Sequence, residues 1–189
     1  MTREELLDLF QRSGALLEGH FRLTSGLHSS GYLQCALVLQ HPAHAEALGR
    51  GLGELTRALR PTVVLSPALG GIVIGQEVGR ALGVRAIFAE RQEGKLMLRR
   101  GFTLSASDRV LVVEDVITTG GSTREASDVA VEAGADVIGA AAIIDRSSDL
   151  TRLNLPLFAL VKMEVPAYQP ESCPLCARNV PISKPGSRS

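Results

Sequence analysis

The residues best able to do chemistry in this chain lie between Glu114 and Ser122. Four apolar residues, 110–113, lead directly into two adjacent carboxylates, Glu114 and Asp115. Three hydroxyls and two glycines follow within a few positions: Thr118, Thr119, Gly120, Gly121 and Ser122. An apolar strand, a glycine turn and a helix start in this order are typical of a phosphate site, because backbone N–H groups converge there.

A phosphate held in this turn would face hydroxyl donors and the positive end of a helix expected to start near residue 123. The two carboxylates, Glu114 and Asp115, lie directly before this turn in the sequence. They suit sugar hydroxyls or a ligand that carries Mg²⁺, which prefers oxygen and is usually shared between carboxylates and substrate phosphates. The string is neither a Walker A loop nor a dinucleotide fingerprint, and its combined features disfavour an incidental acidic turn.

Strand-like and helical segments alternate on both sides of this turn. Apolar stretches predict strands at 62–65, 85–89, 110–113, 137–144 and 157–161, and helices are predicted at 42–59, 72–82 and 123–133. The expected fold class is therefore α/β, a parallel sheet flanked by helices. Ligands of such sheets collect at the carboxyl ends of the strands. Residues 66–71, 114–122 and 145–146 should share that edge.

The remaining segments have weaker patterns. A capping box at 2–5, followed by apolar residues at helical spacing up to Leu17, predicts an N-terminal helix. A Ser-, Gly- and His-rich stretch at 21–31 precedes a predicted strand at 32–39. Residues 91–107, with several cations and glycines and no firm periodicity, are expected to form a long mobile loop or ribbon.

Composition narrows the class of protein. At 189 residues, 45% apolar and 21% charged, the chain is expected to fold as a single domain. Its 20 basic and 20 acidic residues leave no net charge, which disfavours nucleic acid as a partner. A charged start and the absence of an apolar run near ~20 residues argue against a signal peptide and a membrane partner. The expected location is the cytoplasm.

The string 110–122 resembles the phosphoribosyl pyrophosphate (PRPP) signature of type I phosphoribosyltransferases. The resemblance implies that Thr118 to Ser122 hold the 5'-phosphate of PRPP, and that Val116 and Ile117 before them also belong to the PRPP-binding residues. It implies that Glu114 and Asp115 hold the ribose hydroxyls and stabilise positive charge at the anomeric carbon. Mg²⁺ is the implied cofactor, held mainly by PRPP itself, and no side chain is assigned to it with certainty.

A second resemblance is narrower. Residues 21–34 look like the N-terminal hood of orotate phosphoribosyltransferases, a segment that purine enzymes of this fold lack. The pair Asp145-Arg146 looks like the family's contact to the orotate carboxylate, for which the planar fork of arginine is suited. The implied orotate-binding residues are Arg146, Thr118, Tyr32 and Leu33. A surface ion pair of Arg146 with Asp145 or Asp149 is the structural alternative.

Two further segments resemble working parts of that family. Leu69 and Gly70 lie in a stretch like its pyrophosphate loop, although a plain strand-to-helix turn would look the same. Segment 91–107 resembles the loop that closes over the active site in this family, often the active site of the partner subunit in a homodimer. The alternative is a solvated charged loop without a role in the site. There Arg91 and Lys95 would bind PRPP, and Lys95 would join Glu114 and Asp115 in catalysis.

This chain also departs from the family at several positions. Many relatives carry lysine where Thr24 and Gly70 stand, lysine where Gln92 stands, and histidine where Met97 stands. These departures leave Lys95 and Arg91 as the main loop cations.

The implied organisation is one phosphoribosyltransferase domain, with a hood from about residues 1–40 plus the C-terminal segment and a core at about 42–162. The implied reaction forms orotidine 5'-monophosphate and pyrophosphate from orotate and PRPP, in UMP biosynthesis. Two rivals stay open. A purine or xanthine phosphoribosyltransferase is disfavoured by the hood string and Asp145-Arg146, and an RNA-binding regulator that keeps the fold is disfavoured by the zero net charge.

The C-terminal segment 170–189, rich in proline, is expected to be irregular. Within it, Cys173 and Cys176 have the spacing of half a zinc site, but no second pair is present and no histidine follows them. A four-ligand site would need Cys35, a distant residue or a second subunit. The sequence therefore favours two free thiols, with Cys35 as a buried small apolar residue.

Overall fold

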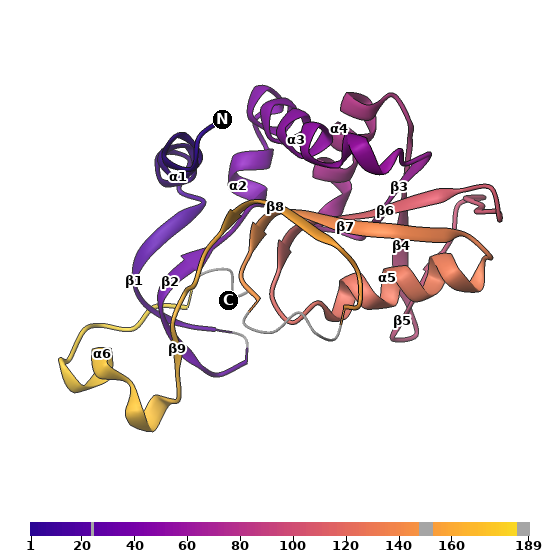
Figure 1. Cartoon of the computed structure of the whole chain (residues 1–189). Helices are drawn as coiled ribbons and strands as arrows, with labels where there is room; N and C mark the ends of the chain where they lie inside the picture. Colours follow the sequence, from indigo (N-terminus) through magenta and orange to yellow (C-terminus); the bar gives the residue numbers. More distant parts are fainter. Residues whose placement is uncertain (24, 148–152, 185–189) are drawn as a thin grey trace. The chain divides into compact units, whose positions relative to one another are not determined.

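Figure 1 shows the computed structural model, which describes residues 1–23, 25–147 and 153–184. The chain divides into two compact units. The hood unit combines residues 1–38 with 164–189, and the core unit spans residues 39–163. The expectation of one domain built from both stays a prediction.

The core unit is built on a sheet that, among the described residues, has six strands in the order β5-β4-β3-β6-β7-β8. Five are parallel, and β5 pairs antiparallel with β4 at one edge. The strands are β3 (Val63–Pro67), β4 (Arg85–Gln92), β5 (Lys95–Leu98), β6 (Arg109–Ile117), β7 (Asp136–Asp145) and β8 (Leu157–Lys162). This confirms the expected α/β class with a mostly parallel sheet.

Helices cover both faces of the sheet. Helices α3 (Pro42–Thr56) and α4 (Gly71–Leu82) lie on one face, and α5 (Gly121–Glu132) lies on the other (Figure 1). A short 3₁₀ turn, η1 (Arg57–Leu59), extends α3. Every residue of β3 is buried, as expected of a strand covered on both faces. None of the helices described has the length and apolar character that a membrane span requires.

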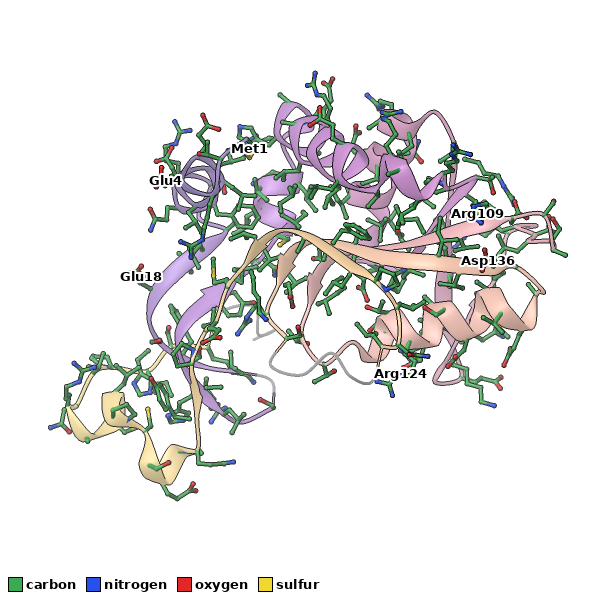
Figure 2. All side chains as sticks on the ribbon, viewed as in Figure 1. Met1, Glu4, Glu18, Arg109, Arg124 and Asp136 are labelled. Atoms are coloured by element: carbon green, nitrogen blue, oxygen red, sulfur yellow. The ribbon has the colours of Figure 1, made fainter. Side chains whose placement is uncertain are left out.

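Direction within the sheet decides where a ligand can bind. Figure 2 shows Arg109 and Asp136 side by side at the starts of β6 and β7, where they form an exposed ion pair of 3.2 Å. The glycine turn and the acidic pair lie at the other ends of these strands. The carboxyl ends of the parallel strands therefore carry the candidate chemistry, as predicted.

The hood unit contains a small antiparallel sheet, in the order β1-β2-β9 among its described residues. It is preceded by α1 (Arg3–Arg12), whose capping box between Thr2 and Glu5 confirms the sequence prediction. Its other elements are β1 (Leu16–Arg22), β2 (His28–Leu33), β9 (Ala167–Tyr168), η2 (Pro170–Ser172) and α6 (Pro174–Ala177). The C-terminal segment thus contains short regular elements where none was predicted.

Two N-terminal predictions are wrong. The predicted strand at 32–39 is instead the end of β2 followed by a short helix, α2 (Ala36–Leu39). A four-residue apolar run has no measurable period, so its type is set by its surroundings. The N-terminal helix ends at Arg12, and Gly14 follows at φ +69°, so Leu17 lies in β1 rather than on the helix.

Segment 91–107 is more regular than a loop. It contains a β-hairpin between β4 and β5, turned at Glu93 and Gly94, which both have positive φ. The side chain of Leu96 is buried in the core cluster, and Phe102 and Leu104 pack against that cluster. The ribbon part of the prediction is therefore confirmed. The segment packs because Leu96, Leu98, Phe102 and Leu104 stand at every second position on either side of its arginines, a pattern hidden by the cations.

The close contact of α3 with α4 depends on glycine at position 49, where there is no side chain. A Cβ atom at Gly49 would lie 2.4 Å from Glu77 Cβ and 2.7 Å from Glu77 carbonyl carbon. We expect Gly49→Ala to lower the free energy of unfolding by about 1–3 kcal/mol, because the rigid backbone of α4 must move. The control is Gly51→Ala on the same helix, where the nearest atom is the flexible end of Leu160 at 3.1 Å. Urea unfolding of both variants checks this, and equal stabilities would contradict it.

Candidate active site

The carboxyl end of β6 opens into a pocket of about 210 Å³. The pocket lies over residues 118–122, the phosphate turn, and over the first turn of α5. Its lining residues are Glu114, Val116, Ile117, Thr118, Thr119, Gly120, Gly121, Ser122, Thr123 and Glu125. All of them belong to the core unit, and most are residues that the sequence had singled out.

The phosphate turn presents donors to this pocket. Gly120 has φ +71°, and a Cβ atom there would lie 2.8 Å from Leu153 Cδ2, so both conformation and packing require glycine. The first hydrogen bond of α5 runs from Arg124 N–H, in the turn labelled in Figure 2, to Gly120 carbonyl. The three N–H groups before it are thus available to an anion. The hydroxyls of Thr118, Thr119 and Ser122 lie on exposed residues beside them.

Glu114 is nearly buried at the end of β6. Burial raises the pKa of its carboxyl to about 7, and the neighbouring Asp115 charge adds to this rise. A hydrogen bond of 3.0 Å from Thr123 hydroxyl to Glu114 Oε1 opposes the rise and fixes the direction of the carboxylate. This role of Thr123 is not visible in the sequence, because the two residues are nine positions apart and meet only when α5 packs against β6.

Asp115 connects the acidic pair to the loop that ends β3. Burial raises the pKa of its carboxyl, against a hydrogen bond of 2.9 Å that Oδ1 accepts from Val116 N–H. A Cβ atom at Gly70 would lie 3.0 Å from both Asp115 carboxylate oxygens. The expected pyrophosphate loop, with exposed Leu69, therefore adjoins the acidic pair, and Gly70 leaves the space in front of Asp115 open.

Arg146 lies beside the phosphate turn on the neighbouring strand. Its backbone N–H donates to Ile117 carbonyl at 2.8 Å. Its guanidinium is half-buried, and Nε has no hydrogen-bond partner within the described parts of the chain. Burial lowers the pKa of Arg146, yet a guanidinium stays charged in proteins. A half-buried cation with an unsatisfied donor is a site for an anion.

The alternative interpretation of Arg146 from the sequence, an ion pair with Asp145, is wrong. The buried Asp145 carboxylate instead accepts hydrogen bonds from Ser147, from its N–H at 2.8 Å and from its hydroxyl. Asp145 thus shapes the strand end rather than neutralising Arg146. Asp149, the other candidate partner, lies outside the described residues.

The cations of the β4–β5 hairpin lie in different settings. Arg91 forms an ion pair of 2.8 Å with Glu125, a pocket residue on α5 that the sequence did not single out. Lys95 is exposed at the start of β5 and makes no ion pair with a described residue. Arg91 is therefore held beside the pocket of its own chain, while Lys95 is available to a ligand.

Comparison with known proteins agrees with this geometry. The phosphoribosyl transferase domain model matches residues 36–156. The orotate phosphoribosyltransferase of Chlorobium phaeobacteroides (strain BS1) is 52% identical to this protein, over the whole chain and 98% of the relative. That of Heliobacterium modesticaldum is 53% identical over the whole length of both chains. The chain belongs to the orotate phosphoribosyltransferase family. A Mycobacterium tuberculosis orotate phosphoribosyltransferase, solved with Fe(III) dicitrate, superposes with a TM-score of 0.72 at 25% identity, covering 85% of this chain and 96% of that one.

Membership of the orotate phosphoribosyltransferase family disfavours both rivals raised by the sequence. The roles of individual residues within it stay predictions, and three of them need comment. Ile117 has a buried side chain, so only its backbone can face PRPP. Tyr32 and Leu33, expected at orotate, lie on β2 of the hood unit. Thr24 lies outside the described residues.

The raised pKa of Glu114 predicts a pH-dependent stability. The folded protein keeps a proton that the unfolded chain releases between pH 4.5 and about 7, so stability falls as pH rises through that range. We expect Glu114→Gln to match wild type near pH 5 and to exceed it by about 1–3 kcal/mol near pH 8.

Urea unfolding of the substrate-free protein at both pH values checks this. The control is Glu132→Gln, an exposed acid at the end of α5, whose effect should be small and equal at both pH values. A Glu114→Gln advantage that did not change with pH would contradict the prediction.

Proposed function

We propose that the protein transfers the 5-phosphoribosyl group from PRPP to orotate, forming orotidine 5'-monophosphate and pyrophosphate in UMP biosynthesis. One observation carries this proposal. The ends of two adjacent strands bring together an anion-binding turn, the buried carboxylate of Glu114, the partly buried carboxylate of Asp115 and the half-buried cation of Arg146. These are the groups that a sugar phosphate and an acidic base require.

The phosphate turn would hold the 5'-phosphate through α5 N–H groups and the three exposed hydroxyls. Glu114 and Asp115 would then accept hydrogen bonds from the ribose hydroxyls. Ionised carboxylates accept these bonds more strongly than neutral carboxyls, so substrate binding would favour the charged forms against the burial that raises both pKa values. Positive charge developing at the anomeric carbon favours them further, so the carboxylates act most strongly in the transition state.

Magnesium fits this site chemically. The potential metal ligands near the pocket are carboxylate and hydroxyl oxygens, the ligand type that Mg²⁺ prefers. Gly70 leaves the Asp115 carboxylate accessible. We infer that Mg²⁺ arrives mainly on PRPP, without a ligand set supplied by the protein alone. When bound, it would neutralise charge on the departing pyrophosphate.

The base panel tests the activity directly. Nucleotide formation from PRPP and Mg²⁺ is measured with orotate, uracil, adenine, guanine and xanthine in turn. We expect turnover with orotate to exceed that with each other base, since only orotate carries a carboxylate for Arg146. Preference for a purine would overturn the proposed substrate and leave the fold assignment intact.

Arg146 is the residue that should distinguish orotate from other bases. We expect Arg146→Ala to weaken orotate binding by about 2–5 kcal/mol, the cost of truncating one partner of a buried charge pair. PRPP binding should change much less. The control, Arg50→Ala, removes an exposed arginine of α3 that pairs with Glu46.

Calorimetric titration with orotate and with PRPP gives both affinities for each variant. Unchanged orotate affinity in folded Arg146→Ala would remove this residue from the site. Thr118, Tyr32 and Leu33 are the proposed further contacts to the base.

We also propose a homodimer in which segment 91–107, which includes the tip of the β4–β5 hairpin, serves the partner's site. The supporting observation is that Lys95, at the hairpin tip, has no ion pair with a described residue of its own chain. A cytoplasmic location is part of the same proposal.

Mixed dimers test the crossing hairpin. Lys95→Ala and Asp115→Asn should each be nearly inactive as homodimers. If the hairpin crosses, a mixed dimer holds one site with both defects and one with neither. Random exchange would then restore activity to about a quarter of wild type, since about half of the dimers are mixed. No recovery despite demonstrated subunit exchange would refute the crossing and leave the proposed activity standing.

A further inference from the structure

Four side chains that the proposed reaction does not use converge in the hood unit. They are His20, His28, Cys173 and Cys176, and one potential ligand atom of each lies within 4.8 Å of the others. His20 is near the end of β1 and His28 begins β2, while the cysteines flank the start of α6. All four lie outside residues 36–156, which the family model matches.

Backbone pairing brings the two pairs together. The β1–β2 hairpin pairs Arg22 with His28, which places His20 and His28 near each other across the ladder. The C-terminal segment is tied to the same hairpin by two hydrogen bonds of 2.8 Å, from Ser183 N–H to His20 carbonyl and from Arg22 N–H to Ser183 carbonyl. The four side chains therefore meet through the fold of a single chain.

Their spacing is that of ligands around one ion. With Zn–N of about 2.0–2.1 Å and Zn–S of about 2.3 Å, tetrahedral ligand atoms lie about 3.3 Å (N to N) and about 3.6 Å (N to S) apart. The distance from His20 Nε2 to His28 Nδ1 is 3.1 Å. The nitrogen-to-sulfur distances are 3.5 Å (His20 to Cys173), 3.8 Å (His20 to Cys176) and 3.3 Å (His28 to Cys176).

The protonation of His20 fits a metal ligand. Its Nδ1 lies 2.8 Å from Val180 carbonyl, an oxygen that only accepts, so Nδ1 carries the proton. In the neutral ring, Nε2 then has one lone pair, and it faces three neighbours at once. One lone pair cannot accept three hydrogen bonds, but it can bind an ion placed between those neighbours. A histidine that binds a metal through one ring nitrogen usually donates the N–H of its other ring nitrogen to a carboxylate, a backbone carbonyl or water, as His20 Nδ1 does here.

The C-terminal segment has little else to hold it. Among its described residues, 164–184, the buried apolar side chains are Cys173 and Leu175 alone. A segment with so small a core normally needs a disulfide or a metal to fold tightly. Cys173 and Cys176 form no disulfide, and His20 and His28 are both buried with ring nitrogens directed at these cysteines.

We propose that His20, His28, Cys173 and Cys176 bind one Zn²⁺ in a closed structural site that fixes the C-terminal segment to the N-terminal hairpin. Two nitrogens and two sulfurs suit zinc, and four protein ligands leave no open position for a substrate. The ion would hold both cysteines as thiolates. Its role is stability of the hood unit rather than chemistry on a bound molecule.

The test uses the full-length chain, reduced with a phosphine and stripped with a chelator, then given Zn²⁺ or Co²⁺. After gel filtration we expect about one zinc per chain by elemental analysis, and a thermal midpoint raised by more than about 5 °C. With Co²⁺ we expect the absorption of a tetrahedral ion together with thiolate-to-cobalt charge transfer. These readouts do not involve PRPP or orotate, so they stand apart from the proposed activity.

His28→Gln and Cys176→Ser should each lower zinc affinity by at least about 100-fold in competition with a chromogenic chelator. The matched control is His41→Gln, an exposed histidine at the start of α3, which should retain wild-type affinity. Wild-type protein that held no more zinc than the two variants, or that bound cobalt without thiolate charge transfer, would overturn the proposal. Because the wild-type stoichiometry and spectrum decide it, poor folding of a variant does not.

Discussion

The candidate site depends on one costly arrangement, two adjacent carboxylates held with little solvent at the end of β6. Burial raises the pKa of both carboxyls, that of Glu114 to about 7, and the charge of Asp115 adds to the rise at Glu114. The strand can tolerate this cost in folding stability because its preceding residues, 110–113, are fully buried between two helical layers. The apolar sheet thus supplies the stability that its acidic end removes, and binding of a ribose with a developing positive charge relieves the cost.

Close packing around these carboxylates depends on glycine. Gly70 allows the loop after β3 to approach Asp115, and Gly71 allows the same loop to approach Val113 carbonyl, 2.8 Å from where its Cβ would lie. Gly120 makes room for Leu153. The loop after β3 can therefore lie directly against the end of β6 and its acidic pair. A side chain at Gly71 would push against the β6 backbone, because the nearest atom there is a carbonyl oxygen.

Sequence patterns were sufficient where a residue's role is local. The strand, turn and helix at 110–133 and the capping box at Thr2 follow from spacing alone. Roles that depend on tertiary contact were not predictable. Thr123 orients Glu114 from a different element, and the alternation that packs Leu96 is masked by the charges around it. The short run at 36–39 lacks a period, so its helical form is decided by its neighbours.

The same distinction explains the hood unit. Cys173 and Cys176 are readable as half of a metal site because they are three residues apart, whereas the two histidines precede them by some 150 residues. Antiparallel pairing of β1 with β2 is what places His20 against His28. The two units are thus stabilised in different ways. A fully covered sheet holds the core unit by apolar burial, whereas the C-terminal segment of the hood unit, which buries few apolar side chains of its own, would gain stability from the proposed zinc.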